Sequence, residues 1–145
     1  MSRRTLIFGS DGMYRSVTRA LCLLVLFCVA SAAQSECQLD NPALQTMQPI
    51  EVVFTSSNGS VKKIIAIHAD DAYKRSQGFQ RVCSERVART PIMFEFGGAA
   101  VIPSFHMQNV VAPLDIAFID SRGRIESIQS MVPYVQGKPQ QRYKP

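Results

Sequence analysis

Hydrophobic and polar residues alternate in several short stretches after residue 48, which is the pattern of half-buried β-strands. In residues 49–55, the apolar side chains of Ile50, Val52 and Phe54 fall on one face of an extended chain. Asn58-Gly59 then predicts a hairpin turn, because Asn and Gly tolerate positive φ. The predicted strands are residues 49–55, 61–67, 92–96, 101–109, 114–119 and 124–128.

One short helix is predicted between the second and third strands, at residues 72–77. Asp70 or Asp71 can cap its first turn with a carboxylate oxygen, and Gly78 can end it. Residues 80–90 carry no clear periodicity and are expected to be irregular.

A second hairpin turn is predicted at residues 120–123, with Gly123 in the left-handed region. Six short strands and one helix indicate a mainly β (α+β) domain. We therefore expect a small antiparallel β-barrel or sandwich with a helix on one side.

The first 33 residues have the composition of a secretory signal peptide. An uncharged apolar run at residues 20–30 follows Arg15 and Arg19 and leads into the small residues 31–33, after which cleavage is expected. The run is shorter than the roughly 18 residues of a membrane-spanning helix, although an uncleaved membrane anchor is the alternative.

Two details of this leader stay open. The cut falls after either Ala32 or Ala33, and translation from Met13 instead of Met1 gives a leader of more ordinary length. After cleavage, residues 34–48 are expected to be an N-terminal tether, and residues 49–145 a single domain.

The charge and the cysteines change with the leader. The chain has a formal net charge of +5, of which four arginines and one aspartate in the first 33 residues contribute +3. The remainder has no clustered basic face, so nucleic-acid binding is not expected. Two cysteines remain, Cys37 and Cys83, and an oxidising compartment favours a disulfide between them over two free thiols.

Residues 105–120 contain His106 and Asp115 among hydrophobic residues and raise the question of a catalytic pair. His106 has no nucleophile motif to act on, so no catalytic residue is assigned. Asp115 is expected to hold a turn by accepting hydrogen bonds from the backbone N–H groups of residues 109–112. His68 lies beside two aspartates, but the chain shows no ligand spacing, so we expect neither a metal nor another cofactor.

The stretch SFHMQNVVAPLDIAFIDSRGRIESI resembles the signature of the family called domain of unknown function 192. That family typically reads Phe-Trp-Met-Lys-Asn-Thr, then Pro-Leu-Asp, then a strand and an Asp-x-x-Gly-Arg turn. The matching positions are Phe105, Met107, Asn109, Pro113, Leu114, Asp115, Asp120, Gly123 and Arg124. Upstream, Gln77-Gly78-Phe79 with Arg81 and Met93-Phe94 are also similar, so that the resemblance covers residues 50–130.

Several positions depart from the family pattern. His106 stands at the usual Trp, Gln108 at the usual Lys and Val110 at the usual Thr, so His106 is not a catalytic group that the family shares. Residues 131–145 are similar to the approach to a final strand and short helix. Either the chain is a shortened product, or one edge of the sheet is left open to strand pairing.

The resemblance implies an exported β-rich domain and no established reaction. We expect a non-catalytic envelope module that binds a partner protein or a small ligand, with the open edge at residues 127–135 and the Met93, Phe94 and Met107 cluster as candidate contact surfaces. Contact with a membrane is expected only through an uncleaved leader. The alternative is an enzyme or metal-binding protein with a site around Arg81, Asn109 and Asp115. The candidate ligand-binding residues are Arg81, Met107, Asn109 and Asp115.

Overall fold

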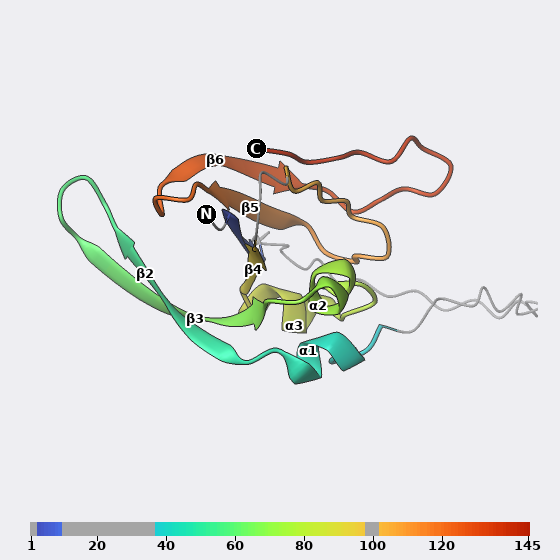
Figure 1. Cartoon of the computed structure of the whole chain (residues 1–145). Helices are drawn as coiled ribbons and strands as arrows, with labels where there is room; N and C mark the ends of the chain where they lie inside the picture. Colours follow the sequence, from blue (N-terminus) through green and yellow to red (C-terminus); the bar gives the residue numbers. More distant parts are fainter. Residues whose placement is uncertain (1–2, 10–36, 98–101) are drawn as a thin grey trace, which may run out of the picture.

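The computed structural model describes residues 3–9, 37–97 and 102–145, which form a single six-stranded sheet and three short helices (Figure 1). The strands are β1 Arg3–Gly9, β2 Pro49–Thr55, β3 Val61–Ala69, β4 Ile92–Phe96, β5 Leu114–Ile119 and β6 Ile125–Met131. The helices are α1 Pro42–Thr46, α2 Ala72–Gln77 and α3 Ser84–Arg89. The mainly β class is thus confirmed.

The strands lie in the order β2-β3-β4-β1-β5-β6, and the sheet does not close into a barrel. β3 and β4 run parallel, whereas the other neighbouring pairs are antiparallel. The expected all-antiparallel arrangement is therefore wrong for this one pair. A parallel pair needs a long crossover, and α2 and α3 supply it between β3 and β4.

Local signals place the β2–β3 hairpin and α2 where the sequence predicts them. Gly59 has a φ of +82° in the hairpin turn. The Asp71 carboxylate accepts a hydrogen bond of 2.8 Å from the Lys74 N–H and so caps α2. Gly78 ends the helix with a φ of +44°, where a side chain would also press on the Phe94 ring at 3.3 Å.

Three expectations need correction. Residues 84–89 form α3, although the sequence predicted no regular structure there. The strand predicted at residues 101–109 is absent from its described part, residues 102–109, where only Phe105 makes an isolated bridge, to Tyr143. The expected tether at residues 34–48 is part of the fold from Cys37 onward, because α1 buries Ala43 and Leu44.

β1 lies in the middle of the sheet, although its residues were assigned to the leader. Arg3–Gly9 pairs with β4 on one side and with β5 on the other. The rest of the predicted leader, including both cleavage positions, lies outside the described residues.

The sheet has two unlike faces. On one face, which we call the helix side, the helices and residues 102–113 cover a large buried cluster (Figure 1). The other face, which we call the groove side, carries a smaller buried cluster of Leu6, Ala66, Met93 and Ile119. Alternation along each strand sends neighbouring residues to opposite faces, so both clusters are built from the same strands.

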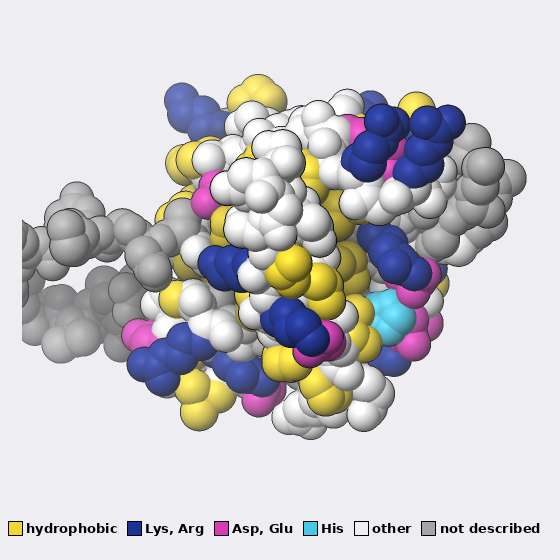
Figure 2. Space-filling view, turned by 90° about the vertical axis from the view of Figure 1, so that its left-hand side faces the viewer, with side chains coloured by type: hydrophobic (Ala, Val, Ile, Leu, Met, Phe, Trp, Pro, Cys, Tyr) yellow, Lys and Arg dark blue, Asp and Glu magenta, His cyan; other side chains and the backbone are white. Residues whose placement is uncertain are grey.

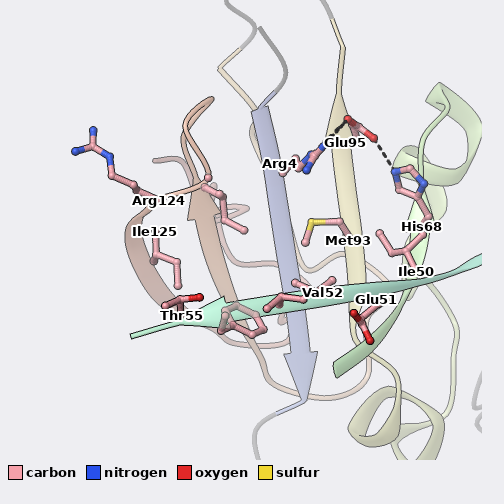
Figure 3. A pocket seen from close by; sticks show the side chains of 14 residues that line it. Arg4, Ile50, Glu51, Val52, Thr55, His68, Met93, Glu95, Arg124 and Ile125 are labelled. Carbon is pink, nitrogen blue, oxygen red and sulfur yellow. Dashed lines mark hydrogen bonds and ion pairs between the residues drawn. The ribbon is translucent and has the colours of Figure 1, made fainter. Parts of the chain in front are cut away.

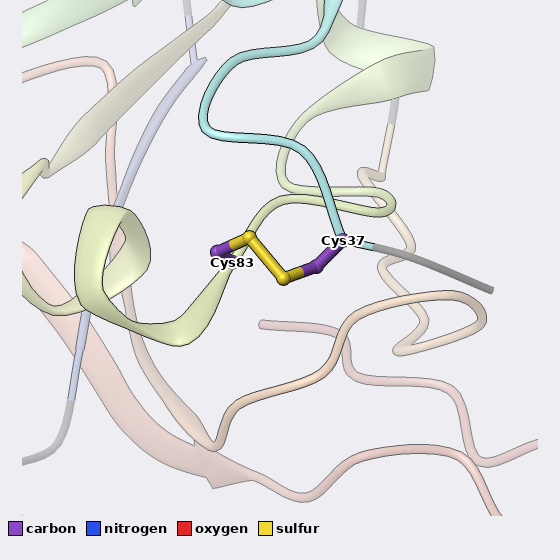
Figure 4. The surroundings of a disulfide bond; sticks show 2 residues. All are labelled: Cys37 and Cys83. Atoms are coloured by element: carbon purple, nitrogen blue, oxygen red, sulfur yellow. A yellow bond between two sulfur atoms is a disulfide. The ribbon is translucent and has the colours of Figure 1, made fainter. Parts of the chain in front are cut away.

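The expected disulfide is present on the helix side. Cys37 and Cys83 are joined, with 4.9 Å between their Cα atoms (Figure 4). Backbone hydrogen bonds reinforce the join, since Gln38 donates to the Arg81 carbonyl and Cys83 donates to the Gln38 carbonyl. The bridge thereby fixes the segment before α1 to the segment before α3.

Candidate functional site

A groove lies on the groove side, between the β2–β3 hairpin and the sheet. Its volume is about 670 Å³, and β2 crosses in front of the sheet to form one wall (Figure 3). Met93 and Ile119 provide an apolar floor, and Ile125 lies at the far end. Residues 50–55 of the hairpin line this wall, and Ile50, Val52 and Phe54 are its half-buried members.

Hydrophobic side chains also run down the middle of the face in Figure 2, with basic and acidic side chains on either side of them. A concave apolar surface with a few polar groups is the usual form of a small-molecule site. The groove is therefore the strongest candidate for a binding site in the described part of the chain.

The polar end of the groove is organised around Glu95. His68 Nε2 lies 2.9 Å from Glu95 Oε2, and Arg4 Nη2 lies 3.2 Å from Glu95 Oε1 (Figure 3). The side chains of His68 and Glu95 are 21% and 27% exposed, so this pair is only partly screened by water. Its geometry fixes the imidazole and carboxylate at the groove wall, where a ligand can reach them.

The opposite end is set by the β5–β6 turn. Asp120 accepts hydrogen bonds from the backbone N–H groups of Arg122 and Arg124, at 2.8 and 2.9 Å, and from Arg124 Nε at 3.0 Å. These hydrogen bonds, led by the one from the Arg124 N–H, lower the pKa of Asp120. Gly123 has a φ of +80° and closes the turn as predicted. A fixed turn therefore holds the Arg124 guanidinium at the rim.

Two of the predicted site residues, Arg81 and Asn109, lie together on the helix side. Both have a φ of 60°, in the region that side chains other than glycine seldom adopt. The Arg81 N–H donates to the Asn109 carbonyl at 2.6 Å, and Asn109 Nδ2 lies 3.4 Å from the Gln80 amide oxygen. This arrangement joins two loops through their backbones, close to the disulfide.

Met107 and Asp115 occupy different surroundings. Met107 is 3% exposed within the helix-side cluster, and its carbonyl accepts from the Val110 and Tyr134 N–H groups. Asp115 alternates with the buried Leu114 and therefore faces the groove side. Ser130 Oγ donates to its carboxylate at 2.7 Å, whereas the sequence suggested donors from the 109–112 turn. The groove is lined by none of the four predicted ligand-binding residues.

The two histidines lie in different places, His68 in the groove and His106 on the helix side. His106 and Met107 line a smaller hollow of about 230 Å³ on the helix side. His106 Nδ1 accepts a hydrogen bond from the Gln108 N–H at 3.3 Å. Burial lowers the pKa of His106, and the charge of Arg142 lowers it further. In the described ranges, no three His, Cys, Asp or Glu side chains converge as metal ligands.

The groove was not predicted from the sequence because it is formed by segments that are far apart along the chain. The alternation of Ile50, Val52 and Phe54 marks one apolar face, but it does not say that this face bends over β4 and β1. A signal was present in β4, where Glu95 interrupts an otherwise apolar strand, since a half-buried carboxylate needs partners.

None of the helices in residues 37–97 or 102–145 has the length and apolar character that a bilayer crossing requires. The family model of domain of unknown function 192, described as "Uncharacterized ACR", matches residues 65–145, which is more than half of the chain. No curated protein and no solved structure gives a significant match. The matched region holds β4, β5, β6 and the Asp120–Gly123 turn, and the chain belongs to the domain of unknown function 192 family.

Proposed function

We propose that this protein is an exported, non-catalytic binding domain that takes a small amphiphilic ligand in the groove beneath the β2–β3 hairpin. The observation that carries this proposal is the groove itself, in which an apolar floor of Met93 and Ile119 lies between the His68–Glu95 pair and the Arg124 rim. An apolar ligand body would cover the floor, and its polar group would hydrogen-bond at either end.

The disulfide supports export, together with the predicted leader. Disulfides form and persist in oxidising compartments and are rare in the cytosol. The bond between Cys37 and Cys83 closes a loop of 46 residues within the domain. His68 and Glu95 belong to β3 and β4, whereas Arg4, which also pairs with Glu95, lies in the predicted leader.

Binding is favoured over catalysis by the pairing of the groove's polar groups. General acid–base catalysis requires a base within reach of a nucleophile or a bound proton donor. His68 is instead engaged by Glu95 at 2.9 Å, and the hydroxyl residue among the described groove-lining residues, Thr55, lies near Ile125 and away from His68 (Figure 3).

Titration with anilinonaphthalene sulfonate, an anionic amphiphile with a fluorescence response to burial, tests the proposal. Phe54→Gln removes apolar wall area and should weaken binding about tenfold. The matched control is Ile65→Gln on the same hairpin, because Ile65 is 61% exposed and does not line the groove. Equal affinities for the two variants would show that the probe binds elsewhere and would sink the proposal.

A second function, binding of a partner protein, is favoured by the outer edge of β6. β6 is an outermost strand, and Ile128 and the following Val132 are 61% and 58% exposed. Unpaired edges with apolar side chains accept a strand from another protein. A photo-crosslinker at position 128 should capture one defined protein of the exported fraction, whereas a crosslinker at position 65 should not. The same products from both positions would exclude docking at β6.

A further inference from the structure

The central strand of the sheet comes from a part of the chain that processing is expected to remove. β1 spans Arg3–Gly9, and the predicted cleavage site lies after residue 32 or 33. A chain translated from Met13 would also lack β1. In either case β4 and β5 lose the strand that lies between them.

β1 is held mainly by interactions that any extended segment could make. It forms antiparallel ladders with β4 over five residues and with β5 over six, and these use backbone groups (Figure 1). Leu6 and Ile7 point to opposite faces and are 1% and 4% exposed. Without a strand here, β4 and β5 would expose two rows of unpaired backbone groups beside apolar walls. A strand is therefore needed between β4 and β5, and either this chain or another polypeptide can supply it.

Two positions show what such a strand must look like. A Cβ atom on Gly9 would lie 2.6 Å from the Ala88 Cα of α3, so only glycine fits at this end. Thr5 is fully buried, and its hydroxyl has no hydrogen-bond partner among the described residues. A valine of the same shape would avoid that unsatisfied group. Residues 3–9 therefore fit between β4 and β5, but a strand with valine at the position of Thr5 would fit better.

We propose that the space between β4 and β5 is a binding site for an extended peptide strand, and that residues 3–9 are its built-in, replaceable occupant. A strand from another polypeptide takes the same place when processing removes β1. The incoming strand has a small apolar residue at the position of Thr5, large aliphatic residues at those of Leu6 and Ile7, and glycine at that of Gly9. A basic residue before them pairs with Glu95, as Arg4 does at 3.2 Å. This site shares the Arg4–Glu95 ion pair with the proposed ligand groove, but the backbone ladders with β4 and β5 and the close approach of Gly9 to α3 lie outside the groove.

The experiment uses the full chain with a protease recognition sequence inserted between Ser10 and Asp11. After cutting, residues 1–10 remain attached only through the sheet. A fluorescein-labelled peptide of residues 1–10 is then added in excess, and its uptake is followed by fluorescence anisotropy and native mass. We expect the labelled peptide to replace the cut strand. A Gly9→Val peptide should bind at least tenfold more weakly, and a Thr5→Val peptide about tenfold more tightly.

Three results would overturn the proposal. The first is a cut protein that keeps its native mass but takes up no labelled peptide, since β1 would then be a fixed part of the fold. The second is equal uptake of the wild-type and Gly9→Val peptides, since the contact with α3 would then select nothing. The third is unfolding on cutting that added wild-type peptide does not reverse. A failure of ligand binding in the groove would leave all these readouts unchanged.

Discussion

The two faces of the sheet are built from the same strands but are used differently. Within the described residues, seventeen buried residues form the helix-side cluster, and four form the groove-side cluster. The helix side is covered by three helices and closed by a disulfide, whereas the groove side is covered only by a hairpin that leaves a hollow. Substitutions on the helix side should therefore change mainly stability, and those on the groove side mainly ligand binding, because changes on one face leave the packing of the other largely intact.

Aromatic packing shows the same contrast. On the helix side, the Phe105 ring makes edge-to-face contacts with Phe94, Phe96 and Phe118, at centroid distances of 5.2 to 6.0 Å. On the groove side, Phe54 is only half-buried against the cluster. Substitutions at matched aromatic positions should therefore differ most in their effect on stability.

The largest effect is expected for Phe118→Ala. Phe118 is 1% exposed, and its loss leaves a cavity among residues that cannot close it, which costs up to about 5 kcal/mol of unfolding free energy. Phe54→Ala on the groove side should cost about 1 kcal/mol, because water already reaches its ring. Urea unfolding of both variants measures the difference. Similar losses would show that the two faces are packed alike.

Removal of the disulfide is next in size. Opening a loop of 46 residues gives the unfolded chain about 4 kcal/mol of conformational freedom in the chain-entropy model. The double variant Cys37→Ala with Cys83→Ala should unfold at a correspondingly lower urea concentration. Reductant should lower the midpoint of the wild type to a similar value and leave that of the variant unchanged. A wild-type unfolding midpoint that does not change when reductant is added would contradict the prediction.

Local patterns predicted the parts of the fold that depend on neighbouring residues. Asn58-Gly59 fixed the hairpin turn, and Asp71 with Gly78 set the ends of α2, because each signal acts within a few residues. α3 was missed because its N-cap is Cys83, whose side chain makes no capping hydrogen bond. A helix without a capping signal cannot be separated from a loop by inspection of so short a segment.

Alternation misled the prediction at residues 102–109. Phe105 and Met107 do point into the core, but they do so from a loop, and their backbones bond to Tyr143, Val110 and Tyr134. β1 was missed for a different reason, since its pairing with β4 and β5 is remote in sequence and the apolar run at residues 20–30 assigned everything before it to a leader. Arg81 and Asn109 were singled out as candidate ligand-binding residues, which stays a prediction; the structure shows that both have left-handed backbones.

Asn41 provides a smaller test of how the helix side is held together. It is 5% exposed, and its oxygen caps α1 through the Leu44 N–H at 2.9 Å. Its amide nitrogen donates to the carbonyls of Gly78 and Gln80. Asn41→Ala leaves these buried groups without partners and should cost about 2 kcal/mol. Asp71→Ala, which removes an exposed cap, is the matched control and should cost less. Equal losses in urea unfolding would mean that burial adds nothing to the Asn41 cap.

The smallest expected effect concerns His106, at the margin of the helix side, where packing gives way to solvent. Burial lowers its pKa below the ordinary value of 6.5, and Arg142 acts in the same direction. A histidine with a lowered folded-state pKa contributes stability above the unfolded pKa, and this contribution is lost as the pH falls through the folded pKa. Between pH 7.5 and pH 5, wild type should therefore lose more stability than His106→Gln, which cannot take up a proton there. His68 is the same in both proteins, so the difference between them reports on His106. If the urea midpoints of the two proteins change in parallel across this range, the hollow around His106 is as open to water as the groove on the other face. The contrast between the two faces then does not extend to this loop.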